Sequence, residues 1–448
     1  MWTSFVSLLV LATGGSYCYV GVTNVTNVTT CKANSRFSKP LQLQAHDTYY
    51  LSKAGVTTTS GIQQDDLPIH QNEVPIENHP HRTPVSQLNE NMPESREEII
   101  ENMISWVRSK GGYFSPKLEI RKMFPDKEVS PLGVFAKEPI DPQENLMHIP
   151  RNCYMDVLDE AEDMEEVEGK EADMANHRNL CKLSHKLMKE MSLGNDSEFS
   201  PYTNYLKTQA PGQLPVNWSK EGKSLLRKVA RSGSEIVDWI DLNFIDAGCI
   251  SKDSFEMHMV EMTIQRSFDT TFIPLWDMVN HDNGLRNTEN DPMYSETGMK
   301  VRASQKIAAG EEILASYDLC IDCYDVADYW GTTEILKDFG FVENYPHRWI
   351  FLKEDFNVWF FIMPVNGTFE VGFDLDSKNE QPYGLPTELG IQFMKEELKR
   401  LEAVGRSHFI HRGAIPKHEW DMIFEYHHVA TNDLSYGILA SEAANAMK

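Results

Sequence analysis

The sequence lacks long hydrophobic runs and carries little positive charge. No internal stretch reaches the roughly 18 apolar residues of a membrane-spanning helix, so no stable membrane span is expected. The 448 residues include 42 Lys and Arg against 67 Asp and Glu, a formal net charge of −25. Nucleic-acid-binding proteins usually present a basic surface, so this balance argues against nucleic acid as a partner. A basic peptide or protein partner fits it.

Cysteine is also scarce. Seven cysteines lie at positions 18, 31, 153, 181, 249, 320 and 323, and this odd, irregular set does not predict a disulfide framework. Cys320 and Cys323 form one CxxC pair, which is half of a zinc or redox motif, and no second CxxC exists. We therefore expect ordinary reduced cysteines there and no metal site.

The N-terminus has the composition of a targeting segment. Residues 1–20 contain a short apolar run, Phe5–Ala12, followed by small residues, as in a secretory signal, although the positive residues that usually precede the run are missing. Residues 21–95 are polar and have no acidic residue before Asp47, which predicts a disordered or transit-like linker. The two segments favour the secretory route with onward transfer to a plastid-like organelle. The alternative is a cytoplasmic protein with a disordered extension.

The first part of the folded region begins with a helix and continues in short strands. Residues 97–109 have apolar side chains at helical spacing, and residues 175–262 return to that spacing after the strands. Strand patterns between the two helical regions lie at 118–120, 133–136 and 146–150. The acidic run 156–174 is typical of a solvated helix or loop; the sharper interpretation is an electrostatic lip for a cationic substrate.

The second part repeats strands and ends in helices. The order of strands, helices, strands and a mixed tail predicts an α+β fold with a helical insertion, and it disfavours a parallel α/β sheet. Strand-like segments lie at 272–275, 300–303, 312–316 and 339–342, then at 349–352, 358–363 and 369–373, and helical patterns follow at about 386–404 and 417–447.

The residues with the clearest chemistry lie in two strand-end segments. Asp277, Asn280 and His281 are packed together where an apolar strand ends, and Tyr317 follows in the segment Gly310–Asp318. Such a pairing indicates a pocket that holds a polar small molecule beside one positioned hydroxyl.

Several segments in this order resemble the SET-domain methyltransferases, in particular the branch that contains the Rubisco large-subunit lysine methyltransferase and the actin-histidine methyltransferase. The similarity covers about residues 98–345. The segments that carry it are Gly133–Ala136 with Ile140 and Leu146–Pro150, Phe199–Leu206 with Leu214, Pro215 and Trp218, Arg266–Phe268, Asp277–His281, Gly310–Tyr317 and Gly340–Phe341.

The resemblance implies a SET β-domain over residues 96–346, with short strands, a knot-like closing segment and a helical insertion at about 175–262. Residues 347–448 would form a mixed, partly helical C-terminal region that binds substrate. The implied cofactor is S-adenosylmethionine (AdoMet), and the implied reaction moves its methyl group to the lysine of a non-histone protein. The alternatives are transfer to histidine, or a catalytically silent SET module that binds a protein.

The resemblance also assigns roles to residues. Leu132 would offer backbone contacts to the cofactor, Asn280 would clamp its amino-acid end, and His281 would hydrogen-bond or stack at its adenine. Arg266 would meet its carboxylate. Asp277 would touch the cofactor or brace the turn.

Tyr317 is the predicted catalytic residue. Its hydroxyl would orient a neutral acceptor amine and contact the cofactor, because methyl transfer depends on positioning the acceptor against the methyl group.

Three departures from the family pattern bear on the site. Ser130 and Pro131 stand where a Glu-Gly or Gly-rich turn is usual. Phe339 stands where a tyrosine is common, and the segment between Tyr317 and Phe339 is longer than usual. Phe339 is expected to line the acceptor channel, where Tyr329 is a candidate to restore the missing hydroxyl.

Overall fold

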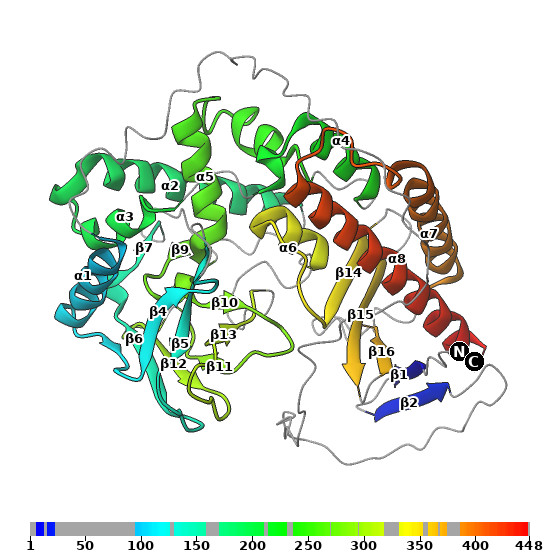
Figure 1. The fold of residues 1–448 in the computed structure, drawn as a ribbon, viewed down its shortest axis with the longest axis horizontal. Coiled ribbons are helices and arrows are strands. Elements are labelled where there is room, and N and C mark those ends of the chain that lie inside the picture. The colour runs from blue at the N-terminus through cyan, green and yellow to red at the C-terminus, as the bar shows by residue number, and fades with distance from the viewer. Residues whose placement is uncertain are drawn as a thin grey trace, which may run out of the picture. The chain divides into compact units, whose positions relative to one another are not determined.

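The computed structural model describes thirteen stretches of the chain, all of which fall within one compact unit (Figure 1). They are residues 6–12, 16–22, 95–125, 130–157, 170–209, 214–230, 236–268, 270–293, 295–317, 331–352, 357–365, 368–373 and 386–446. None of the helices in these stretches is long and apolar enough to cross a membrane.

The predicted first helix is confirmed as α1 (Arg96–Ser109). Ser95 caps its N-terminus: the hydroxyl accepts from the amide of Glu98, and the Glu98 carboxylate accepts from the amide of Ser95. This reciprocal pair satisfies two amide groups that the helix itself leaves unpaired. The apolar stripe that predicted the helix is buried.

The predicted short strands of the first half are also confirmed. β4 (Leu118–Lys122) and β5 (Leu132–Ala136) form an antiparallel pair. β6 (Asn145–Ile149) lies between β3 (Tyr113–Phe114) and a strand far along the chain, β12 (Met299–Ala303), in a four-stranded sheet that β11 (Thr288–Asn290) completes. Segments more than 100 residues apart therefore build one small β-region.

The helical region between these strands contains α2 (Lys170–Leu193), α3 (Ser200–Leu206), α4 (Lys220–Val229), a π-helical turn (Asp241–Ile245) and α5 (Ser254–Arg266). α2 and α5 pack against each other, and the buried hydroxyls of Ser184 and Thr263 lie 3.0 Å apart between them. The last residue of α5 is Arg266, so the helical insertion ends at a residue of the predicted site.

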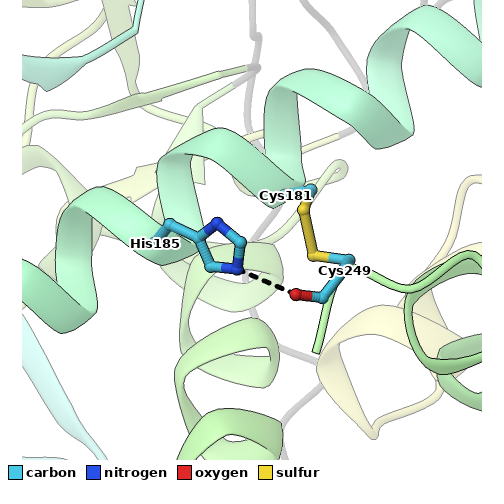
Figure 2. Close-up of side chains that lie close together, drawn as sticks. All are labelled: Cys181, His185 and Cys249. Carbon is cyan, nitrogen blue, oxygen red and sulfur yellow. Dashed lines mark hydrogen bonds between the residues drawn. A yellow bond between two sulfur atoms is a disulfide. The ribbon is translucent and has the colours of Figure 1, made fainter. Parts of the chain in front are cut away.

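One disulfide bond holds the insertion, which corrects the expectation from cysteine spacing. Cys181 of α2 is joined to Cys249, which follows the π-helical turn, and the Nε2 of His185 donates to the Cys249 carbonyl at 2.8 Å (Figure 2). The partners are 68 residues apart, so only the packing of the helices brings them together. Cys320 and Cys323 lie outside the described residues.

This bond leads to a stability prediction. Reducing wild-type protein is expected to lower its free energy of unfolding by about 4 kcal/mol, because the bond closes a long loop in the unfolded chain. The double variant Cys181→Ser, Cys249→Ser should match reduced wild type and should not respond to reductant. Urea unfolding with and without reductant measures both. If both cysteines titrate as free thiols in the unfolded, non-reduced protein, the pair is not a disulfide.

The strands after the insertion are short. β8 (Ser267–Phe268) and β9 (Thr271–Phe272) pair with each other, and β9 also pairs with β7 (Met155–Asp156). β10 (Asn280–His281) runs parallel to β13 (Leu314–Ala315). The prediction at 300–303 is confirmed by β12, but the segments predicted at 272–275 and 312–316 are strands only at 271–272 and 314–315.

The predicted strand at 339–342 is wrong. Phe339 is the last residue of helix α6 (Thr332–Phe339), and Gly340 ends that helix in the left-handed conformation, with φ of +79°. Only glycine adopts this conformation without a steric cost, so Gly340 is a helix cap here. A short apolar run does not distinguish a helix end from a strand.

The C-terminal region combines a sheet with two helices. β14 (His347–Leu352), β15 (Asn357–Val365) and β16 (Thr368–Gly372) are joined by β1 (Val6–Ala12) and β2 (Ser16–Val22) in the order β14-β15-β16-β1-β2. α7 (Glu388–His408) and α8 (Lys417–Asn445) pack together, and α8 contacts β15 and β16 (Figure 1). All three strands and both helices predicted here are confirmed.

This region has its own apolar core. Trp349, Phe351 and Phe360 of the sheet pack with Tyr426 and Leu434 of α8 in one buried cluster. Helix α4 of the insertion joins the same cluster. Because the core is shared, the insertion and the C-terminal region are expected to fold as one unit. The signal sequence predicted for residues 1–20 stays a prediction.

Candidate functional site

Asn280 is the centre of the first half of the site. Its Nδ2 donates to the carbonyl of Leu132 at 2.9 Å and to Oε1 of Glu312 at 2.7 Å. One amide group thus ties β10 to the start of β5 and to the residues before β13. Burial raises the pKa of Glu312, while the hydrogen bond from Asn280 lowers it.

Gly133 leaves the room that this arrangement needs. A Cβ added at Gly133 would lie 2.4 Å from Oε1 of Glu312 and 3.0 Å from Nδ2 of Asn280. Any side chain at this position would therefore press on the hydrogen bond between the two residues. Glycine is required for a close approach here, whatever its backbone angles.

Ser130 braces the turn that precedes β5. Its hydroxyl accepts from the amide of Phe124 at 2.9 Å and donates to the carbonyl of Pro131 at 3.1 Å. Although this turn lacks the usual Glu-Gly sequence, the two hydrogen bonds of Ser130 hold the backbone next to Leu132 in place.

His281 is held by both ring nitrogens. Nδ1 accepts from the amide of Tyr317 at 2.9 Å, so the ring proton lies on Nε2, which donates to Oε2 of Glu343 at 3.0 Å. The side chains of His281 and Glu343 are 1% and 0% exposed. Because both nitrogens are occupied within the protein, the imidazole has no free hydrogen-bonding group for a ligand, and the predicted hydrogen bond to an adenine is not available.

Tyr317 lies directly against His281. Its hydroxyl donates to the carbonyl of Val279 at 3.0 Å, and its ring centroid lies 5.1 Å from that of His281 and 4.6 Å from that of Phe339. Burial raises the pKa of Tyr317 above its ordinary value, so the phenol is neutral at physiological pH. A neutral phenol donates its hydrogen to the Val279 carbonyl, and its oxygen lone pairs can accept a hydrogen bond from a ligand.

Arg266 and Asp277 form a second buried group. The guanidinium donates to the backbone carbonyl of Asp277 at 2.9 Å and to Oε1 of Gln209 at 2.9 Å. Oδ2 of Asp277 accepts from the hydroxyl of Tyr202 at 3.0 Å. Leu275, two residues earlier, has φ of +70°, a strained angle for leucine that turns the chain into this group.

The carboxyl of Asp277 has an unused acceptor. Its Oδ1 is buried and has no hydrogen-bond partner among the described residues. Burial raises the pKa of Asp277 to about 6, although the charge of Arg266 lowers it. A buried oxygen with no partner is costly, so this atom indicates where a ligand with a donor group would be stabilised.

The structure thus gathers the predicted residues Leu132, Asn280, His281, Tyr317 and Phe339 in one place and pairs Arg266 with Asp277 nearby. Tyr329 lies outside the described residues, so its predicted place in the acceptor channel stays a prediction.

Sequence reasoning missed four residues of this site. Glu312 and Glu343 are the carboxylates that hold Asn280 and His281, and Tyr202 and Tyr205 surround the second group. Burial raises the pKa of Tyr205 to about 12, while Arg266 lowers it. The Gly-Glu-Glu sequence before Tyr317 was a usable signal for Glu312, whereas nothing local identifies Glu343.

Comparison with known proteins identifies the domain. Residues 132–318 match the family model described as SET domain, so the predicted SET domain is confirmed for that part of the chain. A comparison with curated protein sequences finds no significant match.

Solved structures of Rubisco LSMT are similar to the chain at low identity. One, bound to sinefungin and monomethyllysine, is 13% identical over 78% of this chain and 92% of that chain, with a TM-score of 0.45. Another, of the SET domain of LSMT bound to lysine and AdoHcy, is 13% identical over 79% and 93%, with a TM-score of 0.46.

Proposed function

We propose that the protein is an AdoMet-dependent protein methyltransferase. The observation that carries this proposal lies inside the region that matches the SET family model: the parallel pair β10–β13 brings Asn280 and Tyr317 to one place. One residue of the pair is suited to clamp a polar cofactor, and the other is suited to orient an acceptor.

The residues present fit such a cofactor. Its ammonium would find an acceptor in the unpartnered Oδ1 of Asp277, and the backbone at Leu132 and Asn280 would border it where Gly133 has no side chain. When bound, AdoMet supplies an electrophilic methyl group. Arg266 already donates to the carbonyl of Asp277 and to Gln209. It would bind the cofactor carboxylate only through N–H groups of the guanidinium that these two hydrogen bonds do not use.

The residues of the second half would prepare the acceptor. A lysine side chain has an ordinary pKa of about 10.4 and must lose its proton before it attacks. The buried surroundings of Tyr317 and Phe339 disfavour the ammonium form and lower that pKa. The Tyr317 oxygen, whose proton is held by Val279, would then accept from the neutral amine and orient its lone pair.

The finer parts of the proposal are a lysine acceptor and a non-histone protein substrate. An acidic protein favours a basic substrate region, which agrees with a lysine target. The C-terminal region, residues 347–448, is proposed to contact that substrate. Histidine transfer is the alternative, because Phe339 in place of tyrosine removes one hydroxyl beside Tyr317.

We also propose that the protein enters the secretory route and is passed on to a plastid-like organelle. The Cys181–Cys249 bond supports an oxidising stage in its life, because disulfides form and persist in such compartments. Retention of a fluorescent fusion of residues 1–95 in the cytoplasm would contradict this.

The enzyme proposal is tested by two measurements on the purified chain. Calorimetry with AdoMet should show binding to one site. Extracts incubated with the protein and isotopically labelled AdoMet should contain labelled proteins, in which mass spectrometry identifies the modified residue as lysine. Label on histidine would favour the alternative. Well-folded protein that does not bind AdoMet would support the silent binding module instead.

A further inference from the structure

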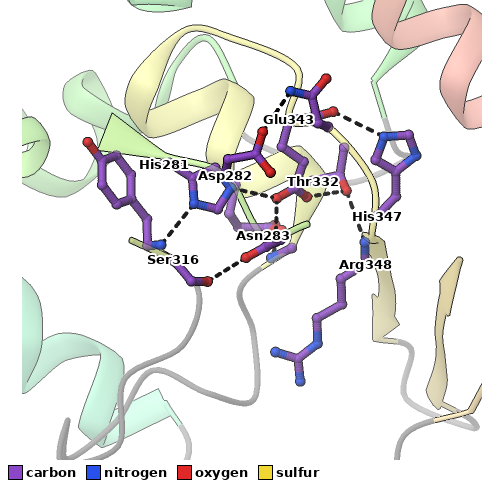
Figure 3. A network of polar contacts seen from close by, with 12 residues as sticks. His281, Asp282, Asn283, Ser316, Thr332, Glu343, His347 and Arg348 are labelled. Atoms are coloured by element: carbon purple, nitrogen blue, oxygen red, sulfur yellow. Dashed lines mark hydrogen bonds and ion pairs between the residues drawn. The ribbon is translucent and has the colours of Figure 1, made fainter. Parts of the chain in front are cut away.

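A chain of buried polar groups connects the site to the C-terminal region. It begins at Glu343, which lies between helix α6 and strand β14 (Figure 3). The Glu343 carboxylate accepts three hydrogen bonds: from Nε2 of His281 at 3.0 Å, from Nδ2 of Asn283 at 3.0 Å and from the hydroxyl of Thr332 at 2.5 Å. Three donors compensate a charge that has no access to water.

The next member is His347 in β14. Its Nε2 lies 3.0 Å from the backbone carbonyl of Glu343, and its Nδ1 lies 2.7 Å from Oδ2 of Asp433 in α8. With an ionised Asp433, which only accepts as the carbonyl does, both ring nitrogens of His347 carry hydrogen. This differs from His281, where one nitrogen accepts from a backbone amide and the ring is neutral.

Asp433 of α8 is the last member of this series of buried polar groups. Its side chain is 0% exposed, and Oδ2 also accepts from the indole Nε1 of Trp349 at 2.7 Å. A buried charged pair contributes little net stability compared with apolar packing, since both charges must be removed from water. The value of this pair is therefore expected to lie in the geometry that it imposes.

The series of hydrogen bonds continues from His347 to the backbone of Tyr317. His347 holds the Glu343 backbone, Glu343 holds the Nε2–H of His281, and Nδ1 of His281 then accepts the amide of Tyr317. The side chains of His281, Glu343, His347 and Asp433 are at most 3% exposed, so water does not substitute for a lost bond between them at low cost.

We propose that His347 and Asp433 are positioning residues for the pocket: the C-terminal helix α8 sets the orientation of His281, and through it that of Tyr317. This inference rests on the proposed function and extends it, because it gives a region expected to bind substrate a role in cofactor binding. Breaking this series of hydrogen bonds should thus weaken AdoMet binding and slow methyl transfer, with little change in the KM for a substrate peptide.

The test compares Asp433→Asn with a matched control, Tyr426→Phe. The control removes a different buried hydrogen bond of α8, the 2.8 Å contact between the hydroxyls of Tyr426 and Thr333 of α6, and leaves the hydrogen bonds from Asp433 to His281 intact. Calorimetry should show AdoMet affinity reduced roughly 10-fold or more in Asp433→Asn and nearly unchanged in Tyr426→Phe. Asp433→Glu, which keeps the carboxylate, should recover part of the loss.

Nitrogen NMR of histidine-labelled wild-type protein gives an independent test that needs no cofactor. In this protein the His347 ring is expected to show both nitrogens protonated, and the His281 ring only Nε2. Asp433→Asn should change the His281 signals, and Tyr426→Phe should not. Equal affinity losses in the two variants, or a singly protonated His347, would overturn the inference. If wild type fails to bind AdoMet, the proposed function fails, while the NMR result still decides the role of α8.

Discussion

Replacing Tyr317 by phenylalanine is expected to lower kcat by at least about 10²-fold, the loss typical of one positioned hydrogen-bonding group at a reacting centre. The Tyr317 oxygen lies beside the Val279 carbonyl, in surroundings too buried for water to replace it cheaply. The ring would still pack against His281 and Phe339. AdoMet affinity should therefore change by less than about 10-fold, and single-turnover assays with labelled AdoMet would separate the two effects.

Tyr426→Phe also serves as the control for this variant. It deletes a buried tyrosine hydroxyl of the same chemistry, one that bonds to Thr333 outside the proposed pocket. It should lose some stability and keep kcat. If Tyr317→Phe retained full kcat, the acceptor would have to be oriented by another group, and Tyr317 would be a core aromatic.

Replacing Gly133 by alanine is expected to reduce AdoMet affinity by about 10- to 100-fold, which corresponds to the roughly 1.5–3 kcal/mol that a hydrogen bond to a charged group contributes. The added Cβ would meet the Glu312 carboxylate at 2.4 Å and displace it from Asn280. The Asn280 amide would then lose its shortest hydrogen bond, the one to Glu312. Calorimetric titration with AdoMet or sinefungin measures the change directly.

Gly390→Ala is the matched control. A Cβ at Gly390 would lie 2.8 Å from Cγ2 of Val358, which is also a close contact, but in the C-terminal region. It should affect unfolding and leave AdoMet affinity unaltered. Unchanged affinity in Gly133→Ala would mean that the cofactor does not depend on the hydrogen bond between Asn280 and Glu312.

The fold was predictable from sequence where one element carries its own pattern. The helix at α1 and the strands β14 to β16 have clear periodicity and were predicted nearly to the residue. The segment at 339–342 was not, because Gly340 ends a helix whose start lies in a stretch with little apolar pattern. Strand pairing across more than 100 residues, as between β6 and β12, has no local signal at all.

The site was predictable in its polar residues and not in their partners. Asp277, Asn280, His281 and Tyr317 stand in recognisable motifs. The hydrogen bonds that decide the protonation of these side chains come from residues distant in sequence. Glu343 fixes the tautomer of His281. Tyr202 donates to Oδ2 of Asp277, while Oδ1 has no partner among the described residues. A motif identifies the side chain, whereas its protonation depends on neighbours that the sequence does not reveal.

The Cys181–Cys249 bond has a consequence for protease digestion. It encloses most of the helical insertion, including Lys207, Arg227 and Lys228. A single tryptic cut after any of these residues would leave the two fragments covalently joined. Nicked protein would migrate as one band in a non-reducing gel and separate into two bands once reductant is added. A cut inside this loop would thus leave the chain covalently in one piece.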